Sequence, residues 1–154
     1  MTGFIWSLVL GCTSAQVSEL DPAGFPEDFR WGTATAGFQV DMGCPTWEAE
    51  VCEDRASDWY QWVTTEEVIN NGNLFVSGEP VSAGPGMWET FESDVALMAA
   101  DGMNAYRLSV EWSRLFPDGG AEAATTVEEL AAHANDDAVQ RYHDLFAALA
   151  EEDI

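Results

Sequence analysis

Two stretches of the chain carry apolar residues at the spacing of an α-helix. In residues 87–100 these residues are three, four and three positions apart: Trp88, Phe91, Val95 and Met98. After Asn135 the same spacing recurs in Val139, Tyr142, Phe146 and Leu149. Because such positions share one face of a helix, we predict two amphipathic helices. Gly102 is expected to end the first helix in a left-handed conformation, and Asn135 to cap the start of the second.

Two further segments have the character of β-strands. Residues 29–36 begin with aromatic residues and continue with small ones. Residues 104–112 alternate, and the alternation assigns one face to Tyr106, Leu108, Val110 and Trp112 and the other to Arg107, Ser109 and Glu111. A face that carries arginine and glutamate is unsuited to an apolar core. We therefore expect it to line a polar interior or a site.

The order of the elements predicts an α/β protein. Residues 41–86 have the composition of a long loop, in which only residues 57–69 show helical spacing, and a loop of this length is usually functional. Residues 121–134 are rich in alanine and glutamate, which favours a helix. Strands and helices thus alternate as in a parallel sheet with crossover helices. Two parallel strands leave open edges and cannot form a stable sheet alone. We therefore expect that the chain is cut where a third strand would begin.

Six small residues, Gly32 to Gly37, run through the end of the first predicted strand. Small side chains in a strand indicate the close approach of a ligand or of another backbone segment. Gln39 follows, and its amide offers one acceptor and two donors, which suits two adjacent hydroxyls of a sugar. The pattern also permits plain tight packing, with Gln39 bonded to backbone groups. Both interpretations stay open at this point.

The charge of the chain restricts its partners. Its 154 residues include 5 Lys+Arg, all of them arginine, and 28 Asp+Glu, for a net charge of −23. Such a surface repels nucleic acid and anionic membranes, so we expect neither as a partner. It suits a protein that stays soluble in high salt, where the repulsion is screened. A hydrophobic content of 47% is too high for a disordered acidic chain, so the protein is expected to fold.

The first sixteen residues differ from the rest. An apolar run, Phe4 to Leu10, is followed by small residues, and no acidic residue occurs before Glu19. This is too short to span a bilayer and indicates an export signal in residues 1–16. The sequence around Cys12 resembles a bacterial lipobox, which would place a lipid anchor on that cysteine. A mis-assigned start or a truncated leader is the alternative interpretation.

The other two cysteines, Cys44 and Cys52, lie eight positions apart in the long predicted loop. In an oxidising compartment they could form a local disulfide, and otherwise they are two loop thiols. No CxxC motif occurs, and His133 and His143 have no cysteine near them in the sequence. We therefore expect no zinc site.

Several motifs together resemble one known family. Residues 29–43, FRWGTATAGFQVDMG, resemble the N-terminal signature of the family 1 glycoside hydrolases, the family of β-glucosidases and β-galactosidases. Residues 94–117, DVALMAADGMNAYRLSVEWSRLFP, resemble the first helix and second strand of that family. Residues 58–63, 77–78 and 84–88 are most similar to its archaeal-type branch. The resemblance covers residues 25–154.

The resemblance implies a (β/α)8 TIM barrel, of which this chain would supply only the first two βα units. Such barrels typically need about 250 residues. Family 1 enzymes are retaining, with one glutamate as the acid and a second as the nucleophile. In the family these glutamates lie in an Asn-Glu-Pro and a Glu-Asn-Gly motif, and neither motif occurs here. The resemblance therefore places no catalytic residue in this chain.

The resemblance does assign roles to individual positions. Gln39 matches the glutamine that binds the non-reducing sugar. Arg107 matches the arginine beside the nucleophile, where its charge would keep that carboxylate ionised. A buried ion pair inside the barrel is a second role for Arg107. Asp41 stands where the family usually has glutamate, which leaves its role open.

Three more positions need an interpretation. Glu111 ends a barrel strand, where catalytic residues of such barrels lie. The family has no catalytic carboxylate there, so we reject it as the acid. Trp112 and Arg114 match residues that we interpret as structural.

The leading hypothesis is an N-terminal fragment of an exported retaining β-glycosidase that acts on a β-linked saccharide or glycoside, without cofactor or metal. Because the catalytic pair is missing, the fragment is expected to be inactive alone. The alternative is a non-catalytic sugar-binding or envelope protein on the same scaffold.

Overall fold

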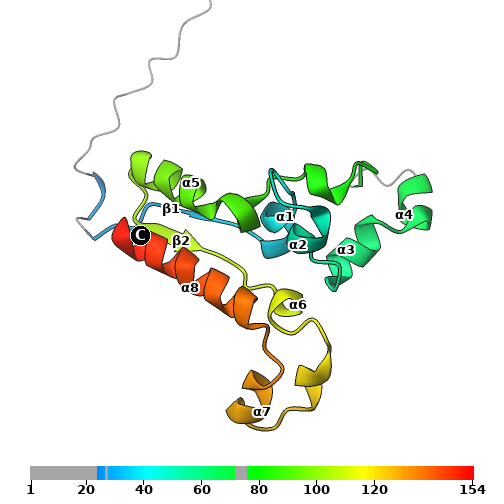
Figure 1. Ribbon diagram of the computed structural model, residues 1–154. Coiled ribbons are helices and arrows are strands. Elements are labelled where there is room, and N and C mark those ends of the chain that lie inside the picture. The colour runs from blue at the N-terminus through cyan, green and yellow to red at the C-terminus, as the bar shows by residue number, and fades with distance from the viewer. Residues whose placement is uncertain (1–23, 27, 72–75) are drawn as a thin grey trace, which may run out of the picture.

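A pair of parallel strands forms the centre of the protein. The computed structural model describes residues 24–26, 28–71 and 76–154. Strand β1 (Gly32–Ala34) pairs with β2 (Ala105–Arg107) so that Thr33 lies opposite Tyr106. The predicted parallel pairing and the α/β class are confirmed, although both strands are shorter than expected (Figure 1).

The described residues also contain eight α-helices. These are α1 (Gly37–Asp41), α2 (Ala49–Cys52), α3 (Asp58–Val63), α4 (Glu66–Asn70), α5 (Met87–Ala100), α6 (Trp112–Leu115), α7 (Val127–Ala131) and α8 (Asp136–Glu151). Short 3₁₀ turns occupy Val81–Ala83 and Gly120–Ala123. The two longest helices, α5 and α8, are the two that the apolar spacing predicts.

The ends of these two helices follow the predicted local chemistry. Gly102, just after α5, has a φ of 74°, in the left-handed region that glycine adopts without a Cβ penalty. The Asn135 side chain accepts hydrogen bonds from the backbone N–H groups of Asp137 and Ala138, at 3.1 and 3.3 Å. These bonds satisfy two of the free donors at the start of α8. The predicted end of α5 at Gly102 and the predicted cap of α8 at Asn135 are both confirmed.

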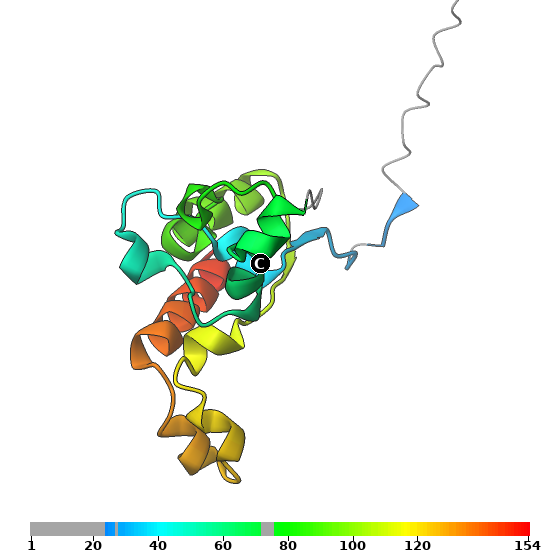
Figure 2. The same ribbon diagram turned by 90° about the vertical axis from the view of Figure 1, so that its right-hand side faces the viewer.

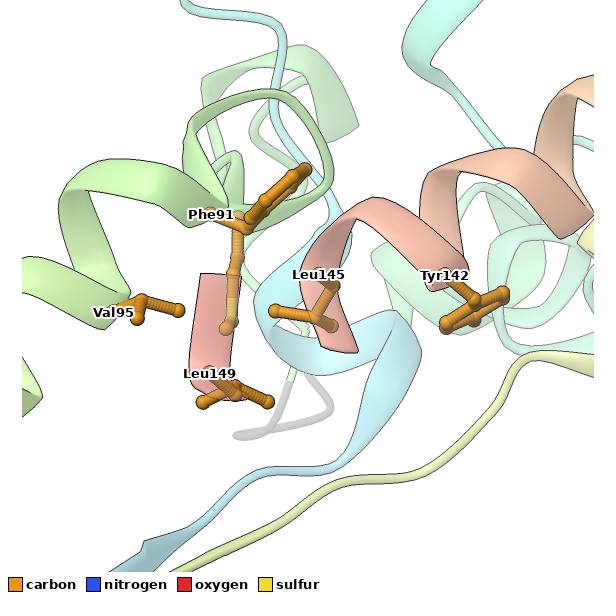
Figure 3. Packing of buried hydrophobic residues seen from close by; sticks show 6 residues of the cluster. Phe91, Val95, Tyr142, Leu145 and Leu149 are labelled. Atoms are coloured by element: carbon orange, nitrogen blue, oxygen red, sulfur yellow. The ribbon is translucent and has the colours of Figure 1, made fainter. Parts of the chain in front are cut away.

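The hydrophobic core lies between α5 and α8. Each helix contributes three buried residues: Met87, Phe91 and Val95 from α5, and Tyr142, Leu145 and Leu149 from α8. Figure 3 shows Phe91 and Val95 of α5 beside Leu145 and Leu149 of α8, with Tyr142 further along α8. Tyr106 and Leu108, on one face of the second strand segment, pack against this cluster. The two helices therefore cover one face of the strand pair.

The prediction that Phe146 lies on the buried face of α8 is wrong. Phe146 is 44% exposed, whereas its neighbour Leu145 is buried. The buried stripe runs through Ala138, Tyr142, Leu145 and Leu149. Adjacent helical residues are about 100° apart, so Phe146 lies on the edge of this stripe.

The second strand is also shorter than its alternation predicts. It ends at Arg107, and Trp112 begins α6. Val110 and Trp112 are 48% and 54% exposed, so they do not share the buried face of Tyr106. The alternation holds from Tyr106 to Ser109, with Arg107 and Ser109 exposed on the opposite side.

Two segments contain more helix, or more breaks, than expected. Residues 41–86 hold α2, α3 and α4 rather than one helical interruption. The break between α3 and α4 follows from two threonines, because the hydroxyls of Thr64 and Thr65 donate to the carbonyls of Tyr60 and Gln61. Residues 121–134 are likewise not one helix. Thr126 starts α7 with a capping box, in which Thr126 Oγ1 accepts from the Glu129 N–H at 3.1 Å.

The structure decides between the two interpretations of the loop cysteines. Cys44 and Cys52 form a disulfide, with their Cα atoms 5.7 Å apart. Disulfide Cα distances usually lie between about 4.4 and 6.8 Å. The bond closes the loop between α1 and α2.

The expected export signal, residues 1–16 with Cys12, lies outside the described residues. Among the helices of the described part, none has the length and apolar character needed to cross a membrane.

Candidate functional site

A groove lies where β1 and β2 end. Both strands point their carboxyl ends the same way, toward α1 and α6 (Figure 1). The cyan and green turns of α1 to α4 and the yellow turn of α6 gather at this end, which faces the viewer in Figure 2. The groove has a volume of about 650 Å³. It is lined by residues of the α1 segment, of α3 and of the segment after β2: Ala36, Gly37, Phe38, Gln39, Met42, Trp59, Trp62, Ser109 and Glu111.

Gln39 is exposed in this groove. Within the described residues, no hydrogen bond joins its side chain to a backbone group, and its role in binding a sugar stays a prediction. The neighbouring residues of α1, Phe38 and Asp41, are both buried. The amide of Gln39 is therefore available to a ligand while the rest of its helix is anchored.

Two indole rings complete the groove. Trp59 and Trp62 of α3 meet edge to face, with ring centroids 5.6 Å apart. They are 56% and 38% exposed, although tryptophan is usually well buried. Sequence reasoning recognised their helical spacing but not their place in the groove. The available signal was the combination of two tryptophans with a long loop of functional length.

Glu111 lies on the other wall and has a fixed position. Its backbone N–H donates to Tyr142 Oη at 2.8 Å. Its carboxylate packs against Gly37, where an added Cβ would collide with Glu111 Oε1 and Cγ. Gly37 is therefore small because a side chain passes beside it. Gly32 is small for another reason, since a Cβ there would collide with the backbone of Ala105 in the paired strand. In both cases the atoms that lie close to the glycine belong to this chain.

Arg107 lies on the face of β2 that points away from α5 and α8. It is exposed, and it takes part in none of the ion pairs found among the described residues. The buried ion pair that we considered for it is therefore not formed within this part of the chain. Ser109, two positions further along the same face, lines the groove.

Asp41 points away from the groove, into the protein. Its Oδ2 lies 3.9 Å from Nε of Arg114, and both residues are 8% exposed. Burial raises the pKa of Asp41 to about 7, because the charged carboxylate loses its hydration. The Arg114 charge opposes this shift, and the charges of Glu111 and Asp54 add to it. Burial prevails because no direct hydrogen bond joins Asp41 to the guanidinium.

The Arg114 side chain joins several elements behind the groove. Its Nη2 donates to the carbonyl of Cys52 at 3.0 Å, and its guanidinium lies 4.2 Å from the ring centre of Trp88. Asp54 is buried nearby and accepts from the Ser113 hydroxyl at 2.6 Å. These contacts agree with the structural role expected for Arg114. Sequence reasoning missed Asp54, because nothing in its own segment marks it as buried.

The groove is chemically suited to a neutral polyol. Indole rings present apolar faces, while the amide of Gln39 and the carboxylate of Glu111 can bond hydroxyl groups. Within the described residues, no cluster of three or more His, Cys, Asp or Glu side chains is placed to hold a metal ion.

Comparison with known proteins gives a consistent result. Residues 21–154 match the family described as Glycosyl hydrolase family 1. The chain is 37% identical over 144 residues to the β-galactosidase of Saccharolobus solfataricus, covering 81% of this chain and 27% of that protein. It is 34% identical over 137 residues to β-glucosidase 10 of Arabidopsis thaliana, covering 83% of this chain and 25% of that protein.

A solved structure agrees in both fold and sequence. The β-glycosidase of the hyperthermophile Thermosphaera aggregans superposes with a TM-score of 0.71 and 32% identity, over 82% of this chain and 29% of that chain. The chain therefore spans about a quarter of the length of the relatives that it matches. On the extent of the family match, together with these identities, the chain belongs to glycosyl hydrolase family 1.

Proposed function

We propose that this chain forms the first two βα units of a retaining β-glycosidase barrel, and that its groove takes the terminal β-linked sugar. One observation carries the proposal. Gln39, Trp59 and Trp62 line a single groove at the carboxyl end of a parallel strand pair. In (β/α)8 enzymes the active site lies at that end of the strands.

One face of the strand pair is left uncovered by the described residues, which supports a larger barrel. Helices α5 and α8 cover one face, while Arg107 and Ser109 are exposed on the other. Parallel sheets are normally covered on both faces, so further elements are needed. The chain matches 27% of the length of its Saccharolobus relative, which leaves room for them.

Retaining hydrolysis needs two carboxyl groups about 5 Å apart, one as acid and one as nucleophile. In the described residues the groove offers one carboxylate, Glu111, and its side chain packs against Gly37. We therefore assign both catalytic glutamates to residues outside this chain. Arg107, exposed two positions before the groove residue Ser109, would then hold the nucleophile ionised through its positive charge.

The test is binding of an aryl β-glucoside to the 154-residue chain, measured by tryptophan fluorescence and calorimetry. Gln39→Ala is expected to weaken binding about tenfold, because it removes hydrogen bonds worth about 0.5–1.5 kcal/mol each. The matched control is Gln61→Ala on α3, a glutamine outside the groove lining. Its affinity is expected to equal that of the original chain, and no hydrolysis is expected in any sample.

Two results would contradict the proposal. The first is equal affinity in the Gln39 and Gln61 variants, which would show that the sugar binds elsewhere. The second is turnover that Glu111→Ala abolishes, because it would place the chemistry on a residue that we reject.

The non-catalytic alternative needs the same groove but not the two glutamates. The coding sequence that follows residue 154 distinguishes the two. Asn-Glu-Pro and Glu-Asn-Gly motifs there would support the enzyme, and their replacement in an otherwise intact barrel would support a sugar-binding protein.

We also propose that the protein is exported. The disulfide between Cys44 and Cys52 supports this, because disulfides persist mainly in oxidising compartments. Mass spectrometry of the mature N-terminus in the native host tests it. A chain that begins at an acylated Cys12 is the expected result, and an intact Met1 in the cytoplasmic fraction would contradict it.

A further inference from the structure

A buried polar cluster lies directly behind the groove and takes no part in lining it. Asp41, Asp54 and Arg114 are each no more than 8% exposed. Arg114 faces Asp41 through its Nε atom and the Cys52 carbonyl through its Nη2 atom. Three separate segments, α1, the end of α2 and α6, therefore meet at one guanidinium.

Both polar partners of Arg114, Asp41 and the Cys52 carbonyl, are connected to the loop that follows α1. Cys52 is completely buried, and its disulfide joins it to Cys44, three residues after Asp41. The Cys44 N–H donates to the Ser82 carbonyl at 2.9 Å. The loop is thus closed on itself, and Arg114 attaches both of its ends to α6.

Helix α1 is short, and its position depends on tertiary contacts, which also include the packing of Val40 against the hydrophobic cluster. It is five residues long and has no side-chain cap at its start. Helices this short are not stable in water by themselves, so tertiary contacts must fix their position. Its buried residues are Gly37 and Phe38 at the start and Asp41 at the end, and Gln39 lies exposed between them.

We propose that Arg114 is a positioning residue for Gln39: by joining Asp41 to the disulfide-closed loop, it fixes α1 so that the amide of Gln39 faces the groove. The proposal rests on the proposed function only in treating Gln39 as the ligand of the sugar. The placement of α1 itself is independent of any sugar. It predicts that the position of Gln39 follows the charge state of Asp41.

Asp41 is surrounded by titratable groups from every element packed against it. Arg114 and Glu111 face it from α6 and the residue before that helix, and Asp54 from the segment after α2. Tyr142 of α8 and Tyr106 of β2 also interact with its charge. Of these groups, only Arg114 attracts the ionised carboxylate. Protonation of Asp41 therefore removes the attraction that ties α1 to Arg114.

The test follows the side-chain amide signal of Gln39 by NMR in the sugar-free chain, between pH 5 and pH 9. The signal is expected to shift with a midpoint near the Asp41 pKa of about 7. The isosteric Asp41→Asn variant is expected to lose this titration. The amide of Gln61, exposed on α3 and outside the groove, serves as the internal control and is expected to stay constant over this range.

A second variant tests Arg114 directly. Arg114→Lys keeps the charge but cannot reach Asp41 and the Cys52 carbonyl together, because lysine lacks the planar fork. It is expected to move the Gln39 signal at pH 9 toward its low-pH position. A midpoint that persists in Asp41→Asn would assign the titration to another group and overturn the proposal. A Gln39 signal unchanged in folded Arg114→Lys would do the same.

Because no sugar is present, these outcomes are separate from those of the binding experiment. If the chain does not bind a glucoside, the proposed function fails, and the NMR titration still decides whether Arg114 positions α1. If the chain does bind, its affinity is expected to change with the same midpoint.

Discussion

The original chain is expected to become less stable as pH rises from about 4 to 7, and the Asp41→Asn variant is expected not to show this change. Asp41 has a pKa of about 7 in the folded protein, against a reference value of 3.8. Between these values the folded state holds a proton that the unfolded state has released. The free energy of unfolding therefore falls as pH rises, by up to about 4 kcal/mol in total.

The sign follows from proton linkage. Stability rises with pH only where the unfolded state binds more protons, and here the folded state binds more. The contribution of Asp41 is thus fully present below pH 4 and is lost as pH rises to 7. Asparagine has the same shape without a titrating group, so the variant lacks this slope.

Chemical denaturation at a series of pH values measures the effect. The net charge of −23 produces a slope of the same sign through general repulsion, so about 1 M salt is needed to screen it. Asp118→Asn is the matched control, because Asp118 is exposed. A slope in Asp41→Asn equal to that in Asp118→Asn would contradict the prediction.

The Gly43→Ala variant is expected to be strongly destabilised, by roughly 3 to 5 kcal/mol. Gly43 has a φ of 121°, which side-chain-bearing residues rarely adopt. A Cβ there would also lie 2.6 Å from the backbone nitrogen of Gly86 and would collide with the carbonyl of Gly84. Neither is a side chain that can move aside, and the Gly86 N–H already donates to the Met42 carbonyl at 2.6 Å.

The Gly102→Ala variant separates the effect of the positive φ from the effect of the steric collision. Gly102 has a φ of 74°, but no heavy atom lies within 4 Å of its hypothetical Cβ. Alanine there is expected to cost only about 1 kcal/mol, from backbone strain alone. Thermal denaturation of both variants provides the comparison. Equal losses would show that the close approach of Gly43 to the Gly84–Gly86 segment contributes nothing.

The elements that depend on local pattern could be predicted from the sequence. The apolar spacing of residues 87–100 located α5 to the residue, and Asn135 marked the start of α8 through its side-chain acceptor. The parallel pairing of β1 and β2 followed from the order of strands and helices. In each case a few neighbouring residues contain the whole signal, since periodicity and capping act within about one or two helical turns.

The predictions that failed depend on contacts between distant segments. Phe146 and Leu145 are equally apolar, and only the position of α5 decides that Leu145 is buried. Trp112 continues the alternation of the second strand, yet it begins α6, because the pairing with β1 ends at Arg107. The threonine hydroxyls that end α3 were visible in the sequence, but their bonding was not.

The sequence by itself determined the family, the two amphipathic helices, the parallel strand order and Gln39 as a sugar-binding candidate. Only the tertiary structure decided what surrounds Gln39. It separated Gly32, which is small because a neighbouring strand approaches it, from Gly37, which is small because Glu111 passes beside it. It brought Trp59 and Trp62 into the groove and turned Asp41 inward to Arg114. The physical reason is that a motif specifies local conformation, whereas burial and electrostatics depend on residues that are far apart in the chain.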